Sequence, residues 1–194
     1  MEESRTAKSR RGPMQATTEA LEQAARRHLE RYATSAEHLR RLLLARVARS
    51  ARAHGTDPEA GAAAVEAIVA RLLAAGLLDD EAYAALEARR QHRRGAPARA
   101  ISWRLAAKGV APEAIDPALA GLAEESADPE LAAALAYARR RRLGPYRPAV
   151  DRAARRQRDL AALDRRGFDL EVARRVIDAE DPARLEAEAE GKTV

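Results

Sequence analysis

The sequence predicts an all-α protein in which three tandem three-helix repeats form an elongated, curved helical array. Hydrophobic residues make up 46% of the 194 residues, but aromatic residues make up only 3%. Alanine dominates the apolar set, which suits closely packed helices and suits strands poorly. Apolar residues also recur at helical spacing, and a glycine-centred turn occurs three times along the chain. These three observations favour helices throughout.

The first repeat is expected over residues 17–78. Thr34 and Glu37 stand three residues apart, as in a capping box where a hydroxyl and a carboxylate satisfy each other's backbone donors. Gly76 predicts a left-handed helix end, onto which Leu77 and Leu78 can pack. The apolar stripes of this repeat are Leu39, Leu42, Leu43 and Val47, followed by Val65, Ile68, Val69, Leu72 and Leu73.

The second repeat is expected over residues 79–125 and the third over 126–180. Residues 1–16 are predicted to be a disordered basic tail, and residues 181–194 an acidic tail that is poor in apolar residues and frays. Pro117 follows Pro112 by five residues and is expected to kink or delay its helix. Helix starts are marked by acidic caps before a proline suited to the first helical position: Asp57-Pro58, Asp116-Pro117, Asp128-Pro129 and Asp181-Pro182.

One turn pattern occurs three times along the chain. In each copy a basic residue and a glycine end one helix, and an acidic residue soon begins the next. The glycines Gly55, Gly109 and Gly167 lie 54 and 58 residues apart. One such helical hairpin cannot bury its apolar stripe alone, so tandem stacking is expected.

Charge alternates strongly along the chain. The formal net charge is +5, but residues 26–52, 88–110 and 139–166 carry net charges of +6, +7 and +8. The intervening acidic stretches, 57–87 and 111–130, each carry −6. Such a pattern fits helix surfaces that neutralise one another. It equally fits a repeated basic face aimed at a polyanion.

Catalytic, metal and membrane signatures are missing from the sequence. The chain has no cysteine, which excludes disulfides, thiolate zinc sites and a catalytic thiol. Its four histidines show no metal-ligand spacing, and no phosphate-cradling glycine loop or nucleophile elbow occurs. No apolar run approaches the roughly 20 residues of a membrane span. We therefore expect no catalytic residue, no metal and no cofactor. Trp103 lies off the stripe of Ile101 and Leu105. It is expected to pack between repeat units, because tryptophan is usually largely buried, and the alternative is contact with a partner.

Arginines on the basic stretches are the candidate binding residues. Guanidinium groups recognise phosphates well, whereas aromatic residues are too sparse for a base-stacking platform. Any contact with single-stranded or duplex DNA is therefore expected to be weak and independent of sequence. The alternative is a solvated helix face without a ligand. The candidates for contact with a partner or DNA are Arg40, Arg41, Arg93, Arg94, Arg139, Arg140, Arg141, Arg142, Arg152, Arg155, Arg156 and Arg158.

Several turn and helix-start motifs of the chain, in the order in which they occur, resemble those of the RecX family. The run from Gly76 to Tyr83 resembles the passage from the first RecX repeat to the second, where the leucine pair closes a core and an aspartate caps the next helix. The turns at Gly109 and Gly167 resemble those of the second and third repeats. The residues that carry the resemblance are Gly76, Leu77, Leu78, Asp79, Asp80, Tyr83, Gly109, Gly167 and Phe168.

The resemblance implies a cytoplasmic, non-enzymatic regulator of the RecA recombinase in recombination, DNA repair and the SOS response. Such a protein lodges in the groove of the RecA filament on single-stranded DNA and mainly inhibits it. It limits filament extension, ATP hydrolysis and strand exchange. The expected partners are therefore the RecA filament and DNA, without a membrane, and the expected state is a monomer.

Two other classes of function compete with this one. A sequence-nonspecific or transcriptional helical DNA-binding module would share the basic faces. A transcription factor would additionally need a recognition helix and usually a dimer interface, and the sequence assigns neither. An enzyme would need a catalytic constellation, and none is visible in the sequence.

Overall fold

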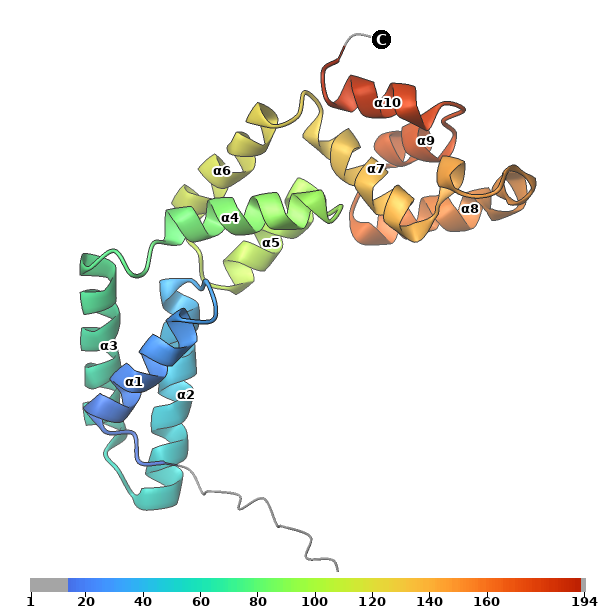
Figure 1. Ribbon diagram of the computed structural model, residues 1–194. Helices are drawn as coiled ribbons and strands as arrows, with labels where there is room; N and C mark the ends of the chain where they lie inside the picture. The colour runs from blue at the N-terminus through green and yellow to red at the C-terminus, as the bar shows by residue number, and fades with distance from the viewer. Residues whose placement is uncertain (1–13, 193–194) are drawn as a thin grey trace, which may run out of the picture. The chain divides into compact units, whose positions relative to one another are not determined.

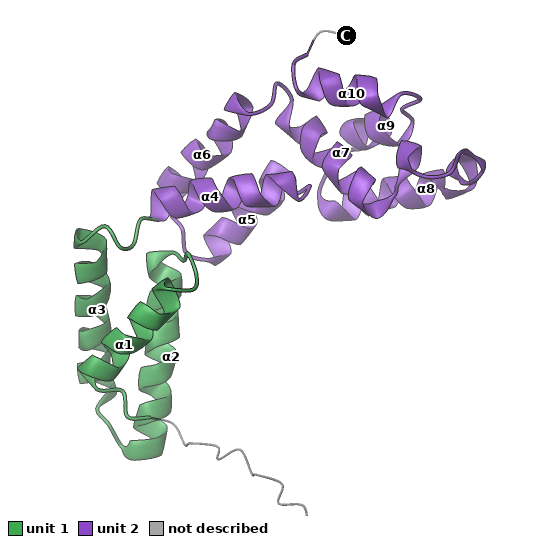
Figure 2. Cartoon of the chain, viewed as in Figure 1, with its two compact units in different colours: residues 1–79 green, residues 80–194 purple. Residues whose placement is uncertain are grey.

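The computed structural model describes residues 14–192, and this part of the chain is helical without any strand. The all-α fold class predicted from the sequence is confirmed. The chain divides into two compact units, residues 1–79 and 80–194 (Figure 2). Most of the basic tail expected over residues 1–16 lies outside the described residues.

Unit 1 holds three helices around one core of leucine, valine and alanine side chains. Leu21 from the first helix, Leu39 and Leu43 from the second, and Val65 and Val69 from the third are all buried. Gly55 ends the second helix in the left-handed conformation, with φ +67°. The helices are α1 (Thr18–Leu29), α2 (Ala36–His54) and α3 (Pro58–Ala74) (Figure 1).

Two details of unit 1 differ from the sequence prediction. The cap of α2 is Ser35, one residue later than expected, because its hydroxyl accepts the backbone N–H of His38 at 3.2 Å. After the left-handed Gly76, Leu78 is buried in the core but Leu77 remains 64% exposed. Of the two leucines, only Leu78 therefore closes this core.

The first part of unit 2 is a thin three-helix cluster with a core rich in alanine. Ala84, Ala88, Ile101 and Leu105 are buried, and Tyr83 packs against them. A short 3₁₀ turn, η1 (Gly121–Glu124), follows the third helix. The helices are α4 (Asp80–Arg93), α5 (Ala98–Ala107) and α6 (Pro112–Ala120).

Two predictions for this part of unit 2 are wrong. Asp116 does not cap a helix, because α6 already begins at Pro112 and Pro117 lies inside it. Helix α6 tolerates Pro117 because only the backbone bond to the Glu113 carbonyl is lost near the end of a nine-residue helix. Trp103, expected to be packed, is 72% exposed on α5. The stripe of Ile101 and Leu105 fills the core and leaves the indole outside.

The second part of unit 2 surrounds a larger core. Leu131 and Leu135, together with Leu163, Phe168 and Val176, are buried there. Gly167 lies in the left-handed region with φ +107°, so the chain reverses and places Phe168 in the core. The elements are α7 (Pro129–Arg141), η2 (Gly144–Tyr146), α8 (Ala149–Arg166), α9 (Leu170–Ile177) and α10 (Pro182–Ala189).

A helix lies within residues 181–192, where the sequence predicts a frayed acidic tail over residues 181–194. Residues 182–189 form α10, which Figure 1 shows beside α9 and α7. The carbonyl of Ala189 accepts hydrogen bonds from the Ser126 hydroxyl at 2.7 Å and from the Asp128 N–H at 3.1 Å. Polar contacts thus anchor a helix that has few apolar residues.

The two parts of unit 2 are joined by contacts between side chains and the backbone. The His92 ring contacts the Pro129 carbonyl at 2.7 Å, and the Ala98 N–H donates to the Glu130 carboxylate at 2.7 Å. Gly95 has φ +69°, and a Cβ added there would lie 2.5 Å from the Tyr137 backbone nitrogen. Only glycine allows α4 and α7 to approach this closely.

We predict that Gly95→Ala destabilises unit 2 by roughly 2–5 kcal/mol, because left-handed strain is added to an overlap with the backbone of α7. Urea unfolding followed by circular dichroism measures the loss. Gly76→Ala is the matched control, because Gly76 has φ +65° but no atom within 4 Å of an added Cβ. It should cost only about 1–2 kcal/mol. Equal losses in the two variants would contradict the close approach at Gly95.

Candidate polyanion-binding groove

An arginine-lined groove of about 410 Å³ lies in unit 2, between α8 and the segment that follows α7. Five of its eight lining residues are arginines, and one is an aspartate. We call this site the arginine groove. It is lined by Arg141, Leu143, Arg147, Arg155, Arg158, Asp159, Ala162 and Arg165.

One face of α8 supplies half of the lining. Arg155, Arg158, Ala162 and Arg165 are spaced three, four and three residues apart, so their side chains lie along one stripe of the helix. Another face of α8 carries Leu160 and Leu163 into the core. Packing of that apolar face therefore fixes the direction in which the arginine stripe points.

A buried carboxylate connects the two walls of the groove. Asp159 is only 2% exposed and accepts the Gly144 N–H at 2.9 Å. It also accepts two bonds from the Arg147 guanidinium, at 2.9 Å from Nη2 and 3.1 Å from Nε. This carboxylate holds η2 against α8 and neutralises Arg147.

The other four arginines of the groove keep their charge available. Within residues 14–192, Arg141, Arg155, Arg158 and Arg165 form no ion pair with a carboxylate. Guanidinium groups that face one hollow without counter-charges create a positive potential. They also present the planar donors that bind phosphate or carboxylate through paired hydrogen bonds. The groove is therefore suited to a polyanion.

The start of α8 is held by a further arginine. The guanidinium of Arg152 donates to the carbonyls of Pro145 at 2.7 Å and Arg147 at 3.2 Å. This side chain therefore supports the turn that lines the groove instead of lining it. The role of Arg152 is to position its neighbours.

Comparison with known proteins identifies the family of the chain. Regulatory protein RecX of Myxococcus xanthus (strain DK1622) is 41% identical over 168 residues, which cover 86% of this chain and 89% of that protein. The chain belongs to the RecX family. Regulatory protein RecX of Agrobacterium fabrum (strain C58) is 37% identical over 100 residues, 52% of this chain and 51% of that protein. No solved structure matches significantly.

The family model for the second three-helix domain of RecX matches residues 79–119. This range contains α4 and α5 and all but the last residue of α6. The first cluster of unit 2 is thus the part of the chain that this model describes. Gly109, which has φ +77°, forms the turn between α5 and α6 there.

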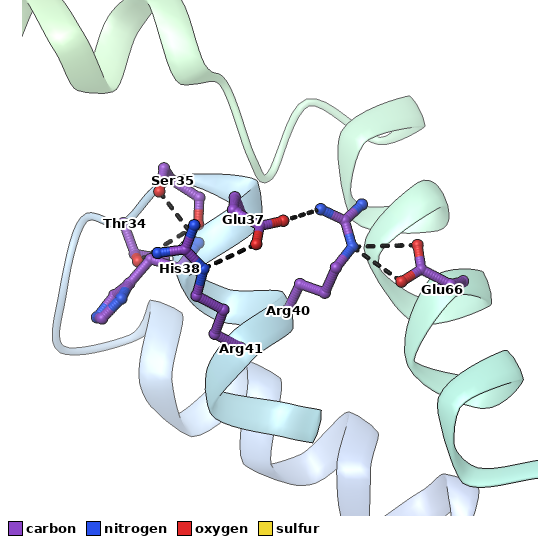
Figure 3. A network of polar contacts seen from close by, with 7 residues as sticks. All are labelled: Thr34, Ser35, Glu37, His38, Arg40, Arg41 and Glu66. Carbon is purple, nitrogen blue, oxygen red and sulfur yellow. Dashed lines mark hydrogen bonds and ion pairs between the residues drawn. The ribbon is translucent and has the colours of Figure 1, made fainter. Parts of the chain in front are cut away.

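Arg40 and Arg41, two of the candidate binding residues chosen from the sequence, are neutralised in unit 1 (Figure 3). Arg40 binds Glu37 at 2.5 Å and Glu66 at 2.9 Å, and Arg41 binds Glu37 at 2.8 Å. Hydrogen bonds from Arg40, and then from Arg41, hold the pKa of Glu37 below its ordinary value. The charges of Arg40 and Arg41 are largely satisfied within the chain.

Other proposed arginines lie outside the arginine groove. Arg93 and Arg94 are exposed at the end of α4. On α7, Arg139 lies 3.5 Å from Glu186, and Arg140 lies over the ring of Tyr137, 5.8 Å from its centre. Arg142 ends α7 in the left-handed conformation, with φ +54°.

Some arginines of α8 line the groove and another is neutralised by a carboxylate, a difference that net charge alone does not reveal. Arg155 and Arg158 line the groove with Arg141, whereas Arg156 pairs with Asp178 at 2.6 Å. The binding set proposed from the sequence did not include Arg147 and Arg165. Arg165 follows Arg158 by seven residues and therefore lies on the same face of the helix. This spacing could have identified Arg165 from the sequence.

The Glu37 network of unit 1 predicts a stability difference that depends on pH. Because the folded pKa of Glu37 is lowered, its stabilising effect is complete above the unfolded pKa of about 4.3. The effect is lost as pH falls through the folded value. Glu37→Gln should cost about 0.5 kcal/mol at neutral pH and nothing in strong acid. Thermal melts across the acid range measure this, and a difference that persists unchanged in strong acid would contradict it.

Asp159→Asn should destabilise unit 2 by about 2–4 kcal/mol, because a buried carboxylate that accepts three hydrogen bonds is replaced by a neutral amide. Asp151→Asn is the control on the same helix, since Asp151 is exposed and its loss should change stability by less than about 0.5 kcal/mol. Urea unfolding of both variants makes the comparison. The idea that Asp159 holds the groove together is wrong if the two variants are equally stable.

Proposed function

We propose that this RecX-family chain is a non-enzymatic regulator, mainly an inhibitor, of the RecA recombinase. It would bind in the groove of the RecA filament on single-stranded DNA and limit filament extension, ATP hydrolysis and strand exchange. Recombination, DNA repair and the SOS response are the processes affected. Support comes from the 41% identity to regulatory protein RecX of Myxococcus xanthus over most of both chains.

The arginine groove is the observation that carries this proposal. Arg141, Arg155, Arg158 and Arg165 face one hollow without carboxylate partners among the described residues. Phosphodiesters of a DNA strand are spaced polyanionic ligands, and arginine binds each through directed hydrogen bonds. Contacts to phosphate carry no sequence information. The groove therefore fits a regulator that follows DNA of any sequence.

The three-helix repeats are proposed to act over residues 17–78, 79–125 and 126–180, in a chain that works as a monomer. In residues 14–192 no cluster of histidine, aspartate or glutamate could hold a metal ion. No helix of the described chain is long and apolar enough to cross a bilayer.

The test is single-stranded-DNA-dependent ATP hydrolysis by the cognate RecA, titrated with this protein. Inhibition at ratios well below one chain per RecA subunit is expected, because a protein that blocks filament growth acts on many subunits. Simple competition for DNA would need far more protein. If hydrolysis is unchanged while the chain still binds DNA, a helical DNA-binding module becomes the better description. A mobility shift with different sequences then separates a transcription factor from a nonspecific binder.

Removing two groove arginines should weaken binding to the filament without unfolding the protein. For Arg155→Gln with Arg158→Gln, we expect at least a tenfold loss of affinity for RecA on single-stranded DNA. The slope of log affinity against log salt should fall by about 0.7 for each lost phosphate contact on a single strand. Fluorescence anisotropy over a salt series measures both quantities.

Arg156→Gln is the matched control for the double variant. Arg156 is the neighbour of Arg155 on α8, but its guanidinium pairs with Asp178. Its removal should leave the salt slope unchanged. Loss of filament binding in the control but not in the double variant would remove the groove from the binding site.

A further inference from the structure

Trp103 is the one tryptophan of the chain, and its side chain lies outside both cores of unit 2. The residue is 72% exposed, whereas Ile101 and Leu105 on the same helix are buried. Leaving an indole in water forgoes the large stabilisation that its burial provides. The indole is therefore available to a ligand.

The helix that carries Trp103 has no acidic residue. Residues 88–110 contain six arginines and a lysine without one aspartate or glutamate. Arg99 precedes Trp103 by one helical turn, so the two side chains share a face of α5. The alanines at 100, 106 and 107 are small neighbours on this helix. Trp103 thus stands on a positively charged helix with little steric cover.

A cluster of arginines lies where α5 meets the second part of unit 2, near the end of α8. The Arg166 guanidinium donates to the Gly95 carbonyl at 3.0 Å and lies over the Tyr137 ring, 5.5 Å from its centre. Arg140 lies over the same ring at 5.8 Å. Burial, and then the nearby charge of Arg104, lower the pKa of Arg166.

These like charges are held together without a counter-charge. Among the described residues, Arg99, Arg140 and Arg166 form no ion pair with a carboxylate, and Arg104 binds the neutral side chain of Gln91 at 2.7 Å. The guanidinium of Arg99 lies beside Gly167, the residue that follows Arg166. Repulsion among the guanidiniums would be relieved by an anion.

The cluster is also continuous in sequence with the arginine groove. Arg165 lines the groove, and its neighbour Arg166 belongs to the cluster. A polyanion that leaves the groove at the end of α8 therefore meets further positive charge next to α5. An apolar pocket of a protein partner could also receive Trp103, but the surrounding charge and the continuity with the groove favour nucleic acid.

We propose that Trp103 stacks on an unpaired base of single-stranded nucleic acid whose phosphates are bound by Arg99 and the Arg104, Arg140 and Arg166 cluster. Bases of a single strand expose their flat faces to an indole, whereas those of a duplex are stacked on one another. A single contact of this kind adds affinity without selecting a sequence. The inference deepens the proposed function, because it names how the chain would contact single-stranded DNA.

Fluorescence of the full chain tests the stacking directly, because Trp103 is the sole tryptophan. We expect saturable quenching by an oligothymidylate and little change with a duplex at the same phosphate concentration. Trp103→Ala should bind a labelled oligothymidylate about 5- to 150-fold more weakly, while Trp103→Phe retains most of the affinity. Leu86→Ala is the control, since Leu86 is another exposed apolar side chain of unit 2, 54% exposed, and should bind normally.

Every other outcome overturns the stacking proposal. Binding of the oligothymidylate without quenching would place the strand elsewhere, and equal quenching by a duplex would remove the requirement for an unpaired base. Quenching that appears only when RecA is added would assign Trp103 to a protein contact. Inhibition of RecA ATP hydrolysis is measured with the same variants. If Trp103→Ala still binds DNA and inhibits normally, the proposed function stands and the stacking does not.

Discussion

The buried carboxylate of Asp159 links the parts of unit 2 on which the candidate site depends. It accepts one backbone N–H from η2 and two bonds from Arg147, and it is itself part of α8. A buried carboxylate in this setting is stabilising only when its hydrogen bonds are complete. The same contacts that satisfy Asp159 bring the end of α7 and the stripe of α8 to a common hollow. The geometry of the arginine groove is thus a consequence of satisfying one buried charge.

The distribution of ion pairs decides which of the many arginines can bind a ligand. The chain has 35 basic and 30 acidic residues, and several basic residues are neutralised by carboxylates on neighbouring helices. Arg40 in unit 1 and Arg156 and Arg175 in unit 2 are examples. In unit 2, the groove and the cluster next to α5 are two places where guanidiniums of the described residues gather without such partners. Local pairing is therefore a better guide to function than the total charge.

The helical fold of this chain could be predicted because its signals are local. Asp57 and Asp128 cap helices where the sequence places them, and Gly167 turns the chain as expected. The predictions that failed depend on packing between helices. Nothing within the Asp116-Pro117 pair shows that α6 has already begun at Pro112, and the exposure of Leu77 and Trp103 depends on where the cores close. Likewise, only the three-dimensional structure separates Arg155 from Arg156, although the helical spacing of α8 already contained the position of Arg165.

We propose that the arginine groove holds phosphates of the DNA inside a RecA filament. Electron cryo-microscopy of this chain bound to the filament on single-stranded DNA tests it most directly. We expect Arg155, Arg158 and Arg165 to lie within about 3 Å of phosphate oxygens. A bound chain whose α8 stripe faces solvent, with other helices meeting the DNA, would contradict it.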